Sequence, residues 1–119
     1  MSHIAEIAVQ FKDMDCLRRA AASCGAEVIG EGEHRLFGAS VKGFAVKLKD
    51  WQYSVVIQDG KVSFDNFRGL WGKIEGLNAL RQRYAVEVAK KAARQKGMSV
   101  REVKQANGTV RLVCQGGGR

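Results

Sequence analysis

Apolar and polar residues alternate at the start of the chain, which predicts a half-buried strand over residues 5–11. Asp13 stands where a helix N-cap is expected, because its carboxylate can accept hydrogen bonds from the free N–H groups of a first helical turn. Apolar residues then recur at helical spacing until Gly25, a residue suited to the left-handed position beyond a helix C-terminus. The opening is therefore expected to be strand, short helix and a second strand over residues 26–29.

The middle of the chain is expected to form an antiparallel meander. The glycine- and glutamate-rich residues 30–34 are typical of an exposed loop, and alternation then predicts strands over residues 44–49 and 53–57. Asp59-Gly60 separates the second of these from residues 62–64. Asp-Gly between apolar alternations is a strong hairpin signal, because a type I′ turn needs positive φ at both central residues.

A long helical pattern runs from about residue 69 to residue 96, and Gly97 is its natural stop. Gly72 and Gly76 each weaken a helix by about 1 kcal/mol relative to alanine. The helix is therefore expected to begin closer to Leu77.

The last part of the chain predicts a hairpin, with residues 100–105 and 109–115 on either side of Asn107-Gly108. The predicted order is β-α-β-β-β-β-α-β-β, an α+β fold with a mostly antiparallel sheet and one short and one long helix packed on one face. Residues 1–115 are expected to form a single domain and residues 116–119 a flexible tail.

Positive charge is concentrated in the second half of this 119-residue chain. Residues 1–60 hold seven Lys/Arg and eight Asp/Glu, whereas residues 61–119 hold thirteen and four, so the halves carry −1 and +9. A basic half suggests an anionic partner such as nucleic acid, a nucleotide or an acidic protein face. A solvated basic surface without a partner is the alternative.

Three cysteines, at positions 16, 24 and 114, form no C-x-x-C pair, which fits reduced thiols in a cytosolic protein. No apolar run approaches the ~18 residues of a transmembrane helix, and the N-terminus lacks the features of a signal peptide. The chain is expected to be cytoplasmic and to make no membrane contact.

Both ends of the chain resemble one known family. The matching residues are Met1 to Ile4, Lys12-Asp13 with Leu17, Arg83 to Ala85, and Asn107 to Val113. On these residues the chain resembles the family named for uncharacterised chloroplast reading frame thirty-five, a family of unknown function found in cyanobacteria, plastids, other bacteria and some phages. The resemblance implies the fold and a cytosolic or stromal setting, and no reaction. It also suggests an accessory role with an ATPase complex as a candidate partner.

Candidate enzyme chemistry is sparse. His34 follows Glu31 and Glu33 and could bind a metal weakly, but stable sites hold their ligands on two elements, so a solvated loop is the favoured interpretation. Cys16 lies in the first turn of a helix, where a thiol pKa is lowered, but no histidine is placed near it as a base. No catalytic residue, metal or cofactor is expected, and the protein is not expected to be an enzyme.

The basic half offers a candidate anion-binding surface. Arg83, Lys90 and Arg94 form one stripe on a helix. Glu87 could pair with Arg83 or Lys91, four residues away on either side, and make this an ordinary solvated face. A two-residue turn at Asn107-Gly108 would place Lys104 directly opposite Arg111, a repulsive pair that an anion would relieve. The residues expected to bind phosphate are Arg83, Lys90, Arg94, Arg101, Lys104 and Arg111.

Aromatic residues cluster in the middle of the chain, apart from the basic residues. Trp51 and Trp71 flank turns and could form an exposed platform, although core or rim packing is the favoured interpretation. Phe67, Leu70 and Trp71, beside two glycines, form the best candidate segment for docking a protein.

The sequence thus favours a non-enzymatic accessory or adaptor module that binds a protein partner. The alternative is binding of nucleic acid, a nucleotide or another phosphorylated ligand through the basic C-terminal half. A homo-oligomer is compatible with either function.

Overall fold

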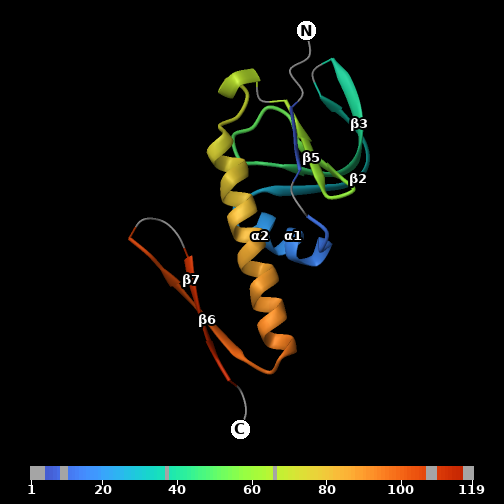
Figure 1. Ribbon diagram of the computed structural model, residues 1–119. Helices are drawn as coiled ribbons and strands as arrows, with labels where there is room; N and C mark the ends of the chain where they lie inside the picture. Colours follow the sequence, from blue (N-terminus) through green and yellow to red (C-terminus); the bar gives the residue numbers. More distant parts are fainter. Residues whose placement is uncertain (1–4, 9–10, 37, 66, 107–109, 117–119) are drawn as a thin grey trace. The chain divides into compact units, whose positions relative to one another are not determined.

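The computed structural model describes residues 5–8, 11–36, 38–65, 67–106 and 110–116 and has the predicted α+β fold (Figure 1). In chain order the elements are β1 (Ala5–Ala8), α1 (Met14–Ser23), β2 (Glu27–Leu36), β3 (Ala39–Lys47), β4 (Val55–Gln58), β5 (Lys61–Phe64), the 3₁₀ turn η1 (Phe67–Gly69), α2 (Ile74–Gln95), β6 (Ser99–Lys104) and β7 (Val110–Gln115). The chain divides into two compact units, residues 1–84 and residues 85–119. The expectation of a single domain over residues 1–115 stays a prediction.

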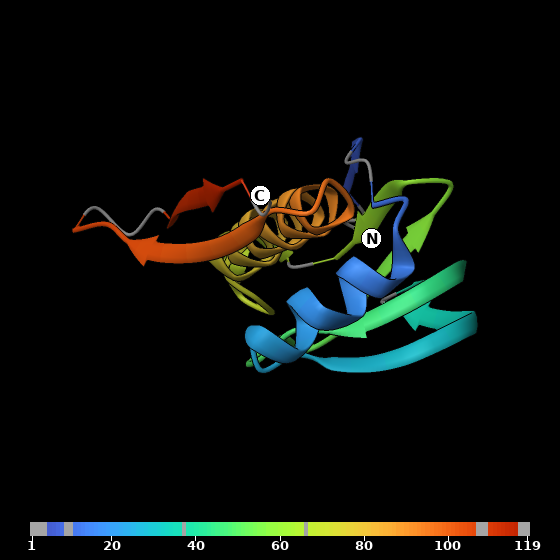
Figure 2. The same cartoon turned by 90° about the horizontal axis from the view of Figure 1, so that it is seen from below.

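The first unit contains a five-stranded antiparallel sheet in the order β1-β5-β4-β3-β2. Strands β1 and β2 are therefore its two edges, and α1, which joins them in the chain, must cross one face of the sheet. Figure 2 shows α1, in blue, lying over β2 and β3. The final hairpin, β6 and β7, forms a separate two-stranded sheet in the second unit.

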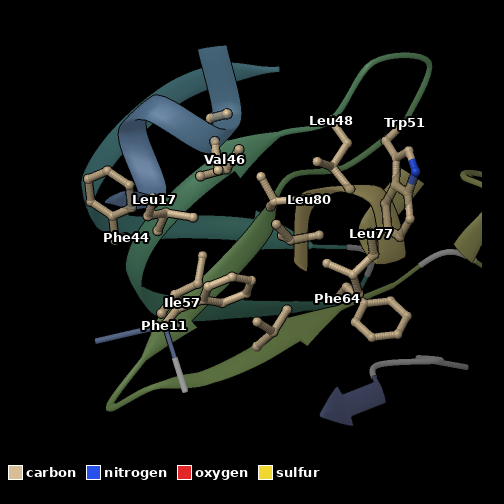
Figure 3. Close-up of a cluster of buried hydrophobic side chains, with 14 residues drawn as sticks. Phe11, Leu17, Phe44, Val46, Leu48, Trp51, Ile57, Phe64, Leu77 and Leu80 are labelled. Carbon is tan, nitrogen blue, oxygen red and sulfur yellow. The ribbon is translucent and has the colours of Figure 1, made fainter. Parts of the chain in front are cut away.

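The main core lies between this face of the sheet and the two helices (Figure 3). Helix α1 contributes Leu17, and the first half of α2 contributes Leu77 and Leu80, all fully buried. The sheet contributes apolar side chains from its central strands, among them Phe44, Val46, Val55, Ile57, Val62 and Phe64. The packing of both helices on one face is thus as predicted.

A smaller buried cluster covers the opposite face of the sheet. It consists of Leu36, Ala45 and Val56, with Val41 and Tyr53 packed against it. Because both faces of the sheet are covered at β4, successive residues Val55, Val56 and Ile57 are all buried. The second, smaller layer explains why three successive residues of β4 are apolar and buried, before the exposed Gln58.

Both helices end as the sequence predicts. Asp13 is the N-cap of α1, and its carboxylate accepts a hydrogen bond from the Cys16 N–H at 3.1 Å. Gly25 has φ 71° and the following N–H of Ala26 donates to the Ala21 carbonyl at 2.9 Å, the pattern of a Schellman motif. The same pattern ends α2 at Gly97, whose φ is 76°.

The predicted Asp-Gly turn is also present. Asp59 has φ 53° and Gly60 has φ 80°, and Gln58 pairs with Lys61 on either side of them. Positive φ at both central residues is the type I′ geometry that joins β4 to β5.

The predicted loop at residues 30–34 is wrong. These residues belong to β2, which pairs with β3 without interruption from Gly30 to Leu36 after a bulge between Val28 and Gly30. Gly30 and Gly32 adopt φ values of 110° and 150°, which glycine alone tolerates, so the strand continues through a sequence that looks like a turn. The two glutamates are tolerated because β2 is an edge strand, where charge is common.

Helix α2 begins at Ile74, one turn before the predicted start near Leu77. The 22-residue helix carries charged side chains along most of its length. Within the described residues, no helix combines the length and apolarity needed to cross a lipid bilayer. Of the predicted tail, Gly116 has no regular structure and residues 117–119 lie outside the described residues.

Candidate binding surfaces

The three docking residues expected from the sequence lie together, with Tyr53 beside them. The rings of Phe67 and Trp71 are stacked, with centroids 4.7 Å apart, and Tyr53 meets Trp71 edge-on at 5.4 Å. Leu70 is 75% exposed, the most exposed of the large apolar residues that the structure describes, ahead of Ile29 at 47% and Val88 at 38%. We call Tyr53, Phe67, Leu70 and Trp71 the aromatic surface.

The backbone around the aromatic surface is fixed by several contacts. The Trp71 carbonyl accepts a hydrogen bond from the Gln52 N–H at 2.7 Å, and the Leu70 N–H donates to the Phe67 carbonyl at 3.1 Å. The Asp65 carboxylate accepts from the Phe67 N–H at 3.3 Å, and Phe67 itself adopts φ 45°, a rare conformation for a bulky residue. The surface is therefore held in one defined shape.

Trp51 and Trp71 do not form a joint exposed platform. Trp51 is only 3% exposed and belongs to the main core, where it meets Phe64 edge-on, whereas Trp71 is half-buried. The Trp51 indole N–H donates to the Lys73 carbonyl at 3.2 Å. Thus the favoured interpretation, core packing, is right for Trp51.

Two glycines make room for Trp51. A Cβ atom at Gly72 would overlap the indole ring, and one at Gly76 would lie 3.1 Å from its Nε1. The glycines that weaken the helical signal in the sequence are therefore the residues against which the indole packs. The same packing fixes the backbone directly after Trp71, which belongs to the aromatic surface.

The residues predicted to bind anions are divided between the two units. Arg83 lies in the first unit, near Cys24. Burial raises the pKa of the Cys24 thiol above its ordinary value, and the positive charge of Arg83 offsets part of the increase. The guanidinium of Arg83 therefore lies close to a half-buried thiol.

Lys90 contacts two carboxylates of the second unit. Its ammonium group lies 2.7 Å from a carboxylate oxygen of Glu102 and 4.0 Å from one of Glu87. Glu87 thus pairs on this helix face with Lys90, three residues away, a different residue from the Arg83 or Lys91 that the sequence suggested. Arg94, Arg101, Lys104 and Arg111 have exposed side chains.

The predicted register of the final hairpin is wrong by one residue. Lys104 pairs with Val110, and Arg111 pairs with Val103, so Lys104 and Arg111 are not directly opposite each other. The prediction assumed a two-residue turn at Asn107-Gly108, residues that lie outside the described part of the chain. Because directly paired residues share a face, the observed register places Arg101 and Arg111 on the same face of the hairpin.

The two residues considered for enzyme chemistry are Cys16 and His34. Cys16 is a buried residue of α1, 2% exposed. His34 Nε2 lies between the carbonyl oxygens of Gly30 and Gly43, at 2.9 and 3.1 Å, and donates its proton to them. Within the described residues, no three His, Cys, Asp or Glu side chains come together as a metal site would require.

A cavity of about 820 Å³ in the first unit was not predicted. Its apolar wall includes Phe11, Phe44 and Ile57, and its charged residues are Lys12, Glu31, Glu33, Lys42 and Asp59. The lining comes from four separate segments, so sequence spacing gives no sign of it. Gly43 is the one lining residue that could have indicated a close backbone approach at this place. A Cβ there would overlap the Ile57 carbonyl oxygen, and only glycine allows this contact. With three carboxylates against two ammonium groups, the cavity does not suit a phosphate.

No family model, curated protein or solved structure matches this chain. The resemblance to the chloroplast reading-frame family therefore stays a prediction.

Proposed function

We propose that this chain is a non-enzymatic protein-binding module whose aromatic surface docks a protein partner. The observation that supports the proposal is Leu70, a large apolar side chain that is 75% exposed and immediately precedes Trp71, whose ring stacks on that of Phe67. Aromatic residues grouped around an exposed aliphatic side chain are typical of the central anchor residues of protein interfaces.

The backbone contacts of this segment favour binding. Because the Gln52–Trp71 hydrogen bond and the packing of Trp51 on Gly72 hold the segment in place, little conformational freedom is lost when a partner docks. The partner is expected to supply an apolar pocket for Leu70.

The proposal is tested by replacing Leu70 with serine. Affinity capture from an extract of the native host should recover a partner with the wild-type chain. With Leu70→Ser, the amount of this partner measured by quantitative mass spectrometry should fall at least about tenfold. The partner should remain bound at about 0.5 M salt, because apolar docking is not screened as ion pairs are. The fold should be unaffected, since the side chain is mostly exposed.

Ile29→Ser is the matched control, because it removes another exposed aliphatic side chain from the same unit. Equal recovery by the wild type and Leu70→Ser would contradict the proposal.

Sedimentation of the purified chain shows whether the partner is a second copy: a dimer that Leu70→Ser converts to monomer would identify the surface as a homo-oligomer interface.

A further inference from the structure

The second unit has far more positive than negative side chains. Residues 85–119 include eight Lys/Arg and two glutamates, so 35 residues carry +6 of the net charge of +8. Both glutamates lie at one place, with carboxylate oxygens 2.7 and 4.0 Å from Lys90. Two carboxylates cannot neutralise eight positive side chains, so a polyanion is a complementary partner for this unit.

The two faces of the β6–β7 hairpin differ. Glu102 faces α2, since it binds Lys90 of that helix. Side chains alternate along a strand, so Arg101 and Val103, with their cross-strand partners Val113 and Arg111, lie on the face turned away from Glu102. Arg101 and Arg111 are diagonal neighbours on this outer face, where the two strands supply no carboxylate.

The composition of the second unit indicates which kind of nucleic acid suits this face. Residues 85–119 contain no Phe, Trp or Tyr, so the unit lacks the aromatic side chains on which unpaired bases stack. A duplex needs no such stacking, because its phosphates and base edges are presented on a regular helix.

The shape of the hairpin suits B-form DNA. Among the described residues, β6 and β7 pair only with each other, so the hairpin is a two-stranded ribbon and not part of a wider sheet. The major groove of B-DNA admits such a ribbon, and arginine can bind the two acceptors of guanine there. In A-form RNA the major groove is too deep and narrow for side chains to read.

We propose that the β6–β7 ribbon binds duplex DNA by placing its Arg101–Arg111 face in the major groove. The proposal is independent of the protein-docking function, which uses residues of the first unit. Val103 and Val113, between the two arginines on the same face, supply apolar contact to thymine methyl groups.

Fluorescence anisotropy of the full chain tests the proposal, with a labelled DNA duplex, the same sequence as single-stranded DNA, and the same sequence as an RNA duplex, all at about 0.15 M salt. The DNA duplex should bind at least about tenfold more tightly than either of the others. Arg101→Ala with Arg111→Ala should weaken duplex binding by at least about 25-fold, since each arginine to guanine contact contributes about fivefold or more.

Lys49→Ala with Lys61→Ala is the matched control, because it removes two exposed positive charges from the first unit. It should weaken binding by no more than about threefold. Arg101→Lys with Arg111→Lys keeps the charge but loses the bidentate geometry, and should restore binding only in part.

Three outcomes would overturn the proposal: equal losses in the ribbon and control variants, RNA duplex or single-stranded DNA bound as tightly as duplex DNA, and full rescue by lysine. Circular dichroism of each variant confirms that the loss is not unfolding. If the ribbon variant loses DNA binding but still captures the protein partner, the docking proposal is unaffected.

Discussion

At the scale of single residues, Trp51 connects the core to the aromatic surface. Its ring packs on Gly72 and Gly76, and its indole N–H is bonded to the Lys73 carbonyl at 3.2 Å. A large aromatic side chain with a satisfied polar group stabilises a small domain more than most residues can. The position of residues 71–73 therefore depends on a side chain that is about twenty residues earlier in the chain.

Gly72→Ala should destabilise the protein by about 1–3 kcal/mol, because the new methyl group would overlap the Trp51 indole and force it to move. Urea unfolding followed by tryptophan fluorescence measures the loss. Gly116→Ala is the control, since a Cβ there meets no atom within 4 Å. A Gly72→Ala protein as stable as the wild type would show that Trp51 does not pack on this glycine.

His34 shows why a residue type alone does not identify a site. In the sequence it follows two glutamates and suggests a weak metal site, whereas alternation along β2 places its side chain on the other face of the strand from Glu31 and Glu33. Its Nε2 is engaged by two backbone carbonyls instead. The histidine helps to hold β2 and β3 together at the Gly43 position.

At the scale of elements, the register of the β6–β7 hairpin determines which side chains act together. In the predicted register Arg101 and Arg111 would lie on opposite faces, and Lys104 would face Arg111. The observed register, displaced by one residue, brings the two arginines to one face and places Lys104 on the face of Glu102. A shift of one residue in strand register thus changes the candidate anion surface.

The ion pair between Lys90 and Glu102 should attach the hairpin to the second half of α2. A double-mutant cycle with Lys90→Met and Glu102→Gln should give a coupling free energy of about 0.5–1 kcal/mol at low salt, because the 2.7 Å pair is partly shielded from water. Chemical denaturation with urea, which adds no ions, measures it. The same cycle at about 1 M salt is the control, and there the coupling should largely disappear. A coupling of zero at low salt would mean that the pair contributes nothing to the attachment.

At the scale of the whole molecule, apolar docking residues and excess positive charge belong to different units. Residues 1–84 carry twelve Lys/Arg and ten Asp/Glu, a net charge of +2, against +6 for residues 85–119. The aromatic surface lies entirely in the first unit and the β6–β7 ribbon entirely in the second. The two proposed activities therefore depend on different residues and respond differently to salt.

Raising the salt concentration should separate the two activities in the wild-type chain. Between about 0.05 and 0.2 M salt, duplex binding should fall by at least about tenfold, because bound counterions are released when phosphates are neutralised. Capture of the protein partner should change by less than about twofold over the same range. Parallel measurements of DNA anisotropy and partner recovery provide the comparison. An equal decrease in both would indicate that the partner is held mainly by charge.

The sequence by itself determined the element order, the N-cap of α1, the C-terminal ends of both helices and the Asp59-Gly60 turn. Capping residues, glycine and hydrophobic period act over a few neighbouring residues. The docking role of Phe67, Leu70 and Trp71 stays a prediction, although the structure stacks the rings of Phe67 and Trp71. Only the tertiary structure decided the edge strands, the cavity, the place of Trp51 and the hairpin register. These depend on contacts between distant segments: Gly30 and Gly32 continue a strand because β3 pairs with them, and Gly72 matters because Trp51 packs against it.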